Sequence, residues 1–133
     1  MKNKIKVTEY NFSSNNVEPT VFAFVSDLHD YPNEPVVKII EKSGADAVLV
    51  PGDFIHNSCM YERGIDFLRM SAEMKPTFCT LGNHESKFEG DIKFLVNGTG
   101  ATLLESQSYM LGGVNIGGIS SGYKNGDKQS RLG

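Results

Sequence analysis

The chain has 133 residues, of which 39% are hydrophobic and 22% charged, a composition typical of one ordinary globular domain. It excludes a disordered, collagen-like or coiled-coil chain. Thirteen Lys and Arg residues against sixteen Asp and Glu residues give a net charge of −3, so binding of a nucleic-acid backbone is not indicated. Two cysteines are too few for a disulfide framework, and no apolar run approaches the ~20 residues of a membrane span. These features predict a cytoplasmic chain without a membrane segment.

Short apolar runs alternate with helical patterns through the first two thirds of the chain. Three runs predict strands, at 21–25, 47–50 and 77–81. A helix is expected between the first two, with Asn33 as its N-cap and Gly44 as its C-cap, and the apolar spacing over 65–74 predicts a second helix. This order predicts a βαβαβ unit with a parallel sheet. Because the first run shows no polar alternation, we expect its strand to be buried on both faces.

The pattern changes after the third run. We expect a further helix within 91–96 and short strands at 102–105, 109–111 and 114–119, the last two forming a β-hairpin. Near the amino terminus, Ile5 and Val7 predict an edge strand. Residues 120–133 are polar and without periodicity, which is typical of a loop or frayed tail. The whole of 1–133 is interpreted as one α/β domain.

Polar clusters follow each of the three predicted parallel strands. They are Asp27-Leu28-His29, Gly52-Asp53 and Gly82-Asn83-His84-Glu85. The carboxyl ends of parallel strands meet at the edge of the sheet where α/β proteins bind ligands. Mixed carboxylate, imidazole and carboxamide donors suit Mn, Fe or Zn. Asp27 and His29 can point the same way from an extended segment, and Asp53 on the middle strand is the natural bridge between two cations. Each cluster alone is a weak signal, whereas the three in this order are a strong one.

These motifs resemble those of the calcineurin-like metallophosphoesterases, whose pattern is D-x-H, then G-D, then G-N-H-[DE]. The resemblance runs from about residue 21 to residue 118 and implies the first half of a four-layer αββα sandwich. It implies two divalent metal ions, with Asp27 and His29 holding the first, Asp53 bridging, and Asn83 holding the second. His84 would be the catalytic residue that faces the substrate phosphate. The implied activity is hydrolysis of a phosphomonoester or phosphodiester by metal-bound hydroxide, on a small-molecule or nucleotide-type substrate.

The sequence departs from the family after the third motif. The family's Gly-His and Gly-His-x-His motifs have no match here, because the histidines are His29, His56 and His84. We therefore expect a partial domain, truncated before those motifs, with an incomplete second metal site. An alternative is a catalytically incompetent metal-binding or structural domain of the same fold. A flavodoxin-like nucleotide-binding or response-regulator domain also fits the βαβ pattern but leaves Gly-Asn-His-Glu unexplained.

Two further side chains near the motifs have open roles. His56 could add a metal ligand, although such a residue is more often an ordinary loop histidine. Glu85 fits the capping of a following helix, or the orientation of a ligand, better than the role of a base. The sheet edges left by a missing half predict an oligomer.

Overall fold

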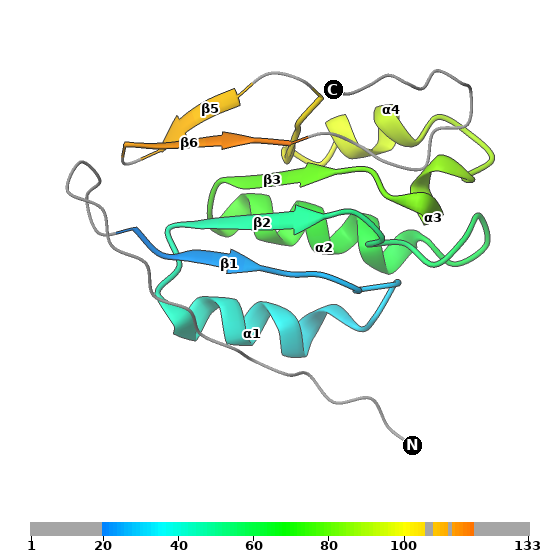
Figure 1. Ribbon diagram of the computed structural model, residues 1–133. Coiled ribbons are helices and arrows are strands. Elements are labelled where there is room, and N and C mark those ends of the chain that lie inside the picture. The colour runs from blue at the N-terminus through cyan, green and yellow to red at the C-terminus, as the bar shows by residue number, and fades with distance from the viewer. Residues whose placement is uncertain (1–19, 106–107, 112, 119–133) are drawn as a thin grey trace.

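A four-stranded parallel sheet forms the centre of the computed structural model, which describes residues 20–105, 108–111 and 113–118. The strands lie in sequential order, β1 (Phe22–Phe24), β2 (Ala47–Pro51), β3 (Thr77–Thr80) and β4 (Thr102–Leu103). All three neighbouring pairs are parallel. Helix α1 (Asn33–Ser43) connects β1 to β2 and α2 (Glu62–Met74) connects β2 to β3, so the predicted βαβαβ unit is confirmed (Figure 1). Helices α3 (Asn83–Ser86) and α4 (Ile92–Asn97) lie between β3 and β4.

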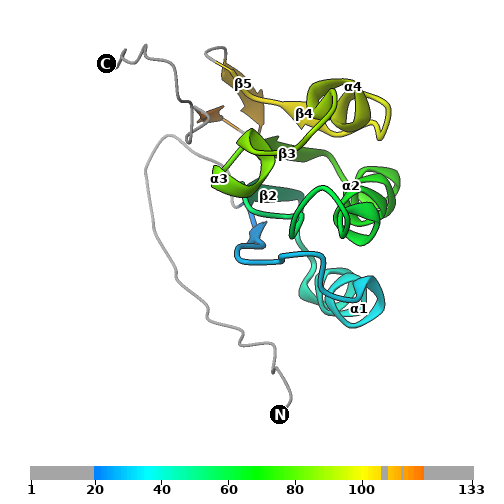
Figure 2. The same ribbon diagram turned by 90° about the vertical axis from the view of Figure 1, so that its right-hand side faces the viewer.

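The three longer helices cover a single face of the sheet (Figure 2). Their apolar stripes, such as Ile65, Phe67 and Leu68 of α2, are buried against the strands. Helix α1 ends at Gly44 in the left-handed conformation, with φ 73°, a backbone geometry that glycine adopts without steric cost. Pro32 rather than Asn33 occupies its N-cap position, one residue earlier than predicted.

A β-hairpin lies against the other face of the sheet (Figures 1 and 2). Strands β5 (Ser108–Leu111) and β6 (Val114–Gly117) pair antiparallel, as predicted. A smaller apolar cluster joins hairpin and sheet, and it contains Ala47, Phe78, Leu104 and Ile116. The prediction that β1 is buried on both faces is wrong, because Phe24 is 70% exposed. This strand lies at the edge of the sheet, and among the described residues no element covers its second face there.

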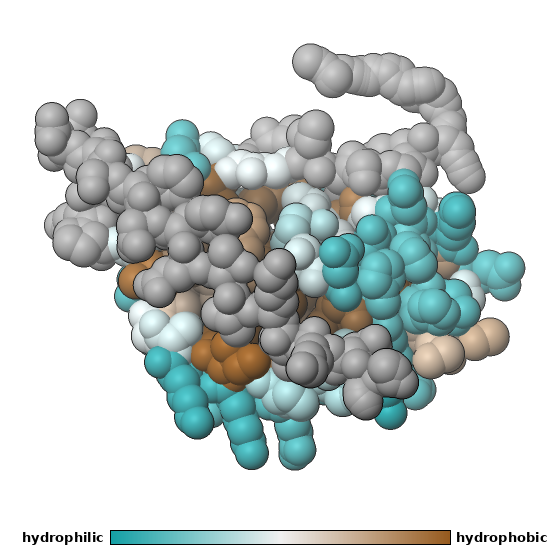
Figure 3. Space-filling view, turned by 60° about the horizontal axis from the view of Figure 1, so that its bottom comes forward, coloured by the Kyte–Doolittle hydropathy of each residue, from teal (hydrophilic) through white to brown (hydrophobic). Residues whose placement is uncertain are grey.

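Some sequence predictions fall on residues that the structure does not describe. The edge strand expected around Ile5 and Val7 and the tail expected at 120–133 lie outside the described residues. Within the described part of the chain, no helix combines the length and apolar character that crossing a membrane requires. The strand carboxyl ends are on the right in Figure 1, and this same side carries a large hydrophilic surface in Figure 3.

Candidate functional site

The loops after β1 and β2 hold several side chains in a strained backbone conformation. Asp27, His29 and Asp30 have φ values of 57°, 44° and 62°, and Asp53 has φ 54°. Non-glycine residues in this left-handed region cost about 1–2 kcal/mol each, and such strain persists where the surroundings impose it, often at functional sites. The residues bearing the D-x-H and G-D motifs are therefore held in place by their surroundings.

Backbone hydrogen bonds fasten the first of these loops to the second. The His29 N–H donates to the Asp53 carbonyl and the Asp30 N–H to the Phe54 carbonyl, both at 3.0 Å. The buried Asp30 carboxylate accepts the Gly64 N–H of α2 at 2.8 Å. Asp30 is not among the site residues predicted from the sequence, although its acidic side chain directly after D-x-H is the signal that could have indicated it.

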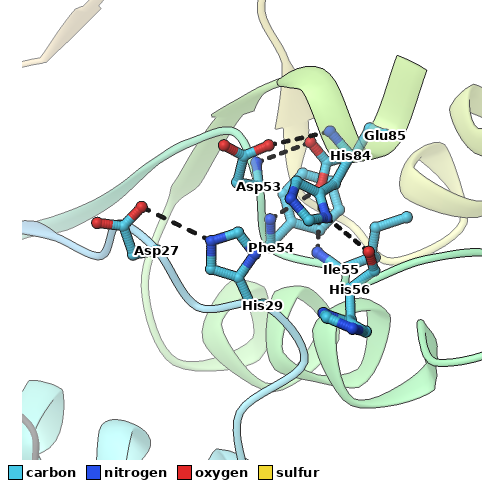
Figure 4. A network of polar contacts seen from close by, with 8 residues as sticks. All are labelled: Asp27, His29, Asp53, Phe54, Ile55, His56, His84 and Glu85. Carbon is cyan, nitrogen blue, oxygen red and sulfur yellow. Dashed lines mark hydrogen bonds and ion pairs between the residues drawn. The ribbon is translucent and has the colours of Figure 1, made fainter. Parts of the chain in front are cut away.

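The buried carboxylate of Glu85 joins the second loop to the third. Its Oε1 accepts the N–H groups of Asp53 and Gly82, both at 2.7 Å. Its Oε2 accepts those of Phe54 at 2.8 Å and Ile55 at 3.0 Å. Glu85 is 1% exposed, and charge-assisted bonds of this kind are about twice as strong as neutral ones. Glu85 thereby fixes the backbone that carries Asp53 (Figure 4).

Two glycines let these loops approach one another. A Cβ built on Gly82 would lie 2.5 Å from Oδ1 of Asp53, and one on Gly52 would lie 2.9 Å from the backbone of Gly82. Gly52 also has φ 79°. The glycines of the G-D and G-N-H-E motifs are thus required by close backbone packing beside the Asp53 carboxylate.

Donor atoms of Asp27, His29 and Asp53 converge at the carboxyl edge of the sheet. Their ligand atoms all lie within 4.8 Å of one another, and Nε2 of His29 is 3.8 Å from Oδ1 of Asp27. The Asp27 side chain is 84% exposed and that of His29 is 35% exposed. Two carboxylates and one imidazole around a common space form a donor set that fits a divalent cation. Asn83 is exposed and begins α3, directly after Gly82 and shortly after the end of β3.

His84 is oriented by the neighbouring loops. Its backbone N–H donates to Oδ1 of Asp53 at 3.1 Å, and its ring Nδ1 lies 2.6 Å from the carbonyl oxygen of His56. Because a carbonyl only accepts hydrogen bonds, Nδ1 carries a proton and Nε2 is the nitrogen left for the site. The His84 ring is 4.5 Å from that of His29 and 5.9 Å from that of His56, between centroids. The structure therefore brings all three histidines of the chain together (Figure 4).

The thiol of Cys79 lies in the hydrophobic core and is unreactive. Burial raises its pKa from the ordinary 9.0 to about 12, and the charge of Glu85 acts in the same direction. A thiol with such a pKa stays protonated near neutral pH, so Cys79 is a core residue and not a nucleophile.

The fold and site define an α/β protein that carries a divalent-cation donor set where its parallel strands end. A family model described as calcineurin-like phosphoesterase matches residues 20–127. The chain belongs to that family, as the motifs of its sequence predict. A comparison with curated proteins found no match to the chain. The family and the donor set together support a phosphoesterase-type or metal-binding domain that uses divalent metal.

Proposed function

We propose that the protein is a metal-dependent phosphoesterase that hydrolyses a phosphomonoester or phosphodiester. The observation that carries this proposal is the convergence of Asp27, His29 and Asp53 beside the oriented imidazole of His84. The proposed substrate is a small-molecule or nucleotide-type phosphate ester, since the net charge of −3 gives no general attraction for a polyanion.

The roles of the site residues follow from their donor atoms. Asp27 and His29 would hold the first of two divalent ions, Asp53 would be shared between the two, and Asn83 would contribute its carboxamide oxygen to the second. When bound, divalent ions supply positive charge to the phosphoryl oxygens and activate water as the nucleophile. Mn, Fe and Zn are the ions that this donor set suits.

His84 acts on the substrate through Nε2. Its Nδ1–H bond to the His56 carbonyl fixes the ring orientation, and a proton on Nε2 can stabilise the charge at phosphorus or pass to the leaving oxygen. Glu85 holds the Asp53 loop through backbone N–H groups and contributes by positioning. No covalent intermediate with the protein is required.

The test is hydrolysis of p-nitrophenyl phosphate and bis(p-nitrophenyl) phosphate by the purified chain in Mn²⁺, Fe²⁺ or Zn²⁺. Asp53→Asn should abolish turnover, and His84→Asn should lower kcat by about 10²–10⁴-fold. Glu41→Gln, an exposed change on α1, is the control. Absence of turnover in a folded chain that binds these metals would contradict the proposal.

That outcome would favour the second candidate, a metal-binding or structural domain without catalysis. The specific observation behind it is that residues 85–133 of this sequence contain no histidine, so the residues assigned here to the second cation are Asp53 and Asn83, neither of which is an imidazole. The two candidates separate cleanly, because both bind metal and only the first gives turnover.

The same reasoning extends to the setting of the protein. We propose that 1–133 forms one domain, since a single sheet is packed on both faces by apolar clusters of the described residues. The free thiols of Cys59 and Cys79 fit a reducing, cytoplasmic environment. The edge strands β1 and β4 offer surfaces for association with a second copy.

A further inference from the structure

The three histidines form a second donor group at the same edge of the sheet. One ligand nitrogen each from His29, His56 and His84 lies within 4.8 Å of the others. His29 and His56 come from the loops after β1 and β2, and His84 comes from α3, which follows β3. Only His29 is shared with the group formed by Asp27 and Asp53. The described part of the site therefore presents two overlapping sets of ligands with different chemistry.

The hydrogen bonding of His84 favours metal ligation by this second group. A histidine that binds a metal through one nitrogen usually donates its other N–H to a carboxylate or a backbone carbonyl, which fixes the tautomer and the ring orientation. His84 has this arrangement, with Nδ1 2.6 Å from the His56 carbonyl oxygen. Its Nε2 is thereby prepared as a donor before any ion binds. His56 contributes twice, through its carbonyl to His84 and through its own ring to the donor group.

We propose that His29, His56 and His84 bind a borderline divalent transition-metal ion, of the class of Ni²⁺ or Zn²⁺. Imidazole nitrogen suits these ions, whereas carboxylate oxygen suits harder ions such as Mn²⁺. Three neutral imidazoles leave the full double charge of the ion in place, which keeps this position attractive to an anionic ligand. Because His29 belongs to both groups, the two groups compete for its imidazole, and Ni²⁺ at the three imidazoles displaces Mn²⁺ from Asp27 and Asp53.

The decisive variant is His56→Ala, because the bond that orients His84 comes from the backbone carbonyl of His56 and survives the loss of the ring. Ni²⁺ affinity is measured by calorimetry on the full chain without a histidine tag. Loss of outer partners of a metal ligand alone weakens binding by 10–100-fold, so loss of the His56 ring should weaken Ni²⁺ binding by at least about 10-fold. Mn²⁺ affinity should change little. Lys87→Ala, another exposed change at this end of the molecule, should change neither affinity.

Asp27→Asn should have the reverse effect of His56→Ala on the two metal affinities. The Asp27 side chain is exposed and its ion-pair partner is His29, so the change should weaken Mn²⁺ binding and leave Ni²⁺ binding nearly intact. The electron paramagnetic resonance signal of free Mn²⁺ reports displacement directly, and His56→Ala should require at least about 10-fold more Ni²⁺ for the same release. Equal Ni²⁺ affinity in the wild type and His56→Ala, or no Ni²⁺ binding by the wild type, would overturn the inference. Neither measurement depends on turnover, so the inference and the proposed hydrolysis can fail separately.

Discussion

Replacement of Glu85 by glutamine tests whether one buried carboxylate holds the site loops together. Each of its two oxygens accepts two backbone N–H groups. An amide NH₂ in place of either oxygen faces two N–H donors, and both lose their acceptor. Hydrogen bonds to charged groups contribute about 1.5–3 kcal/mol each, so Glu85→Gln should lower the free energy of unfolding by about 3–6 kcal/mol.

Urea denaturation followed by circular dichroism measures this change. For a small protein the urea slope is about 1–3 kcal/mol/M, so the midpoint should fall by at least about 1 M. Because Glu85 also binds the N–H of Asp53, Mn²⁺ affinity measured where the variant is folded should fall by about 10–100-fold. The matched control is Glu41→Gln, an exposed change on α1, with an expected effect within about 0.5 kcal/mol. A midpoint and an Mn²⁺ affinity equal to those of the wild type would refute the positioning role of Glu85.

Three further changes test the packing around the site, the core and the exposed strand. Gly82→Ala places a Cβ 2.5 Å from Oδ1 of Asp53 and should reduce Mn²⁺ affinity in calorimetry, whereas Gly98→Ala, whose nearest atoms would be at 3.6 Å, should not; equal losses would contradict the steric argument. The pKa of Cys79 is about 12 in the folded protein against an ordinary 9.0, so above about pH 9 only the unfolded chain releases this proton and stability falls. Between about pH 8 and pH 10.5 this loss is about 2 kcal/mol, and urea titrations of Cys79→Ala should lack it; an identical pH dependence would contradict the assignment. Phe24→Ser removes an aromatic ring of β1 that is 70% exposed and should weaken the proposed self-association, as measured by sedimentation velocity. A wild type that is monomeric at all concentrations would contradict this prediction.

The sheet could be predicted from the sequence because its signals are local. Apolar runs such as 47–50 and the helical spacing over 65–74 specify their own elements wherever the chain places them. The burial of β1 could not be predicted in the same way. Whether Phe24 meets a neighbour depends on what covers the second face of the sheet, and the hairpin of β5 and β6 leaves that ring exposed. A run of apolar residues indicates that a strand forms, but it does not indicate which element packs on each face of that strand.

The candidate site was predictable to the extent that topology determines it. Strand ends of a parallel sheet share one edge, so the motifs containing Asp27, Asp53 and His84 had to meet there. The place of His56 depends on the path of the loop after β2, in which Gly52 and Asp53 both have positive φ, and no spacing rule specifies that path. The bonds of Glu85 to residues 30 to 32 positions away are equally invisible in the sequence. Topology therefore predicts which motifs lie close together, while loop geometry decides which of their side chains contribute to the candidate site.

Strain and hydrogen bonding in these loops balance each other in size. Four non-glycine residues with positive φ cost about 4–8 kcal/mol together, and the four bonds to the Glu85 carboxylate contribute about 6–12 kcal/mol. The strained D-x-H loop is linked to this carboxylate through the Asp53 and Phe54 carbonyls that accept its N–H groups. The hydrogen bonds to the buried Glu85 carboxylate therefore offset the backbone strain of the loops that carry Asp27, His29 and Asp53. A cation then binds donors that are already assembled, and its binding energy need not be spent on ordering the loops.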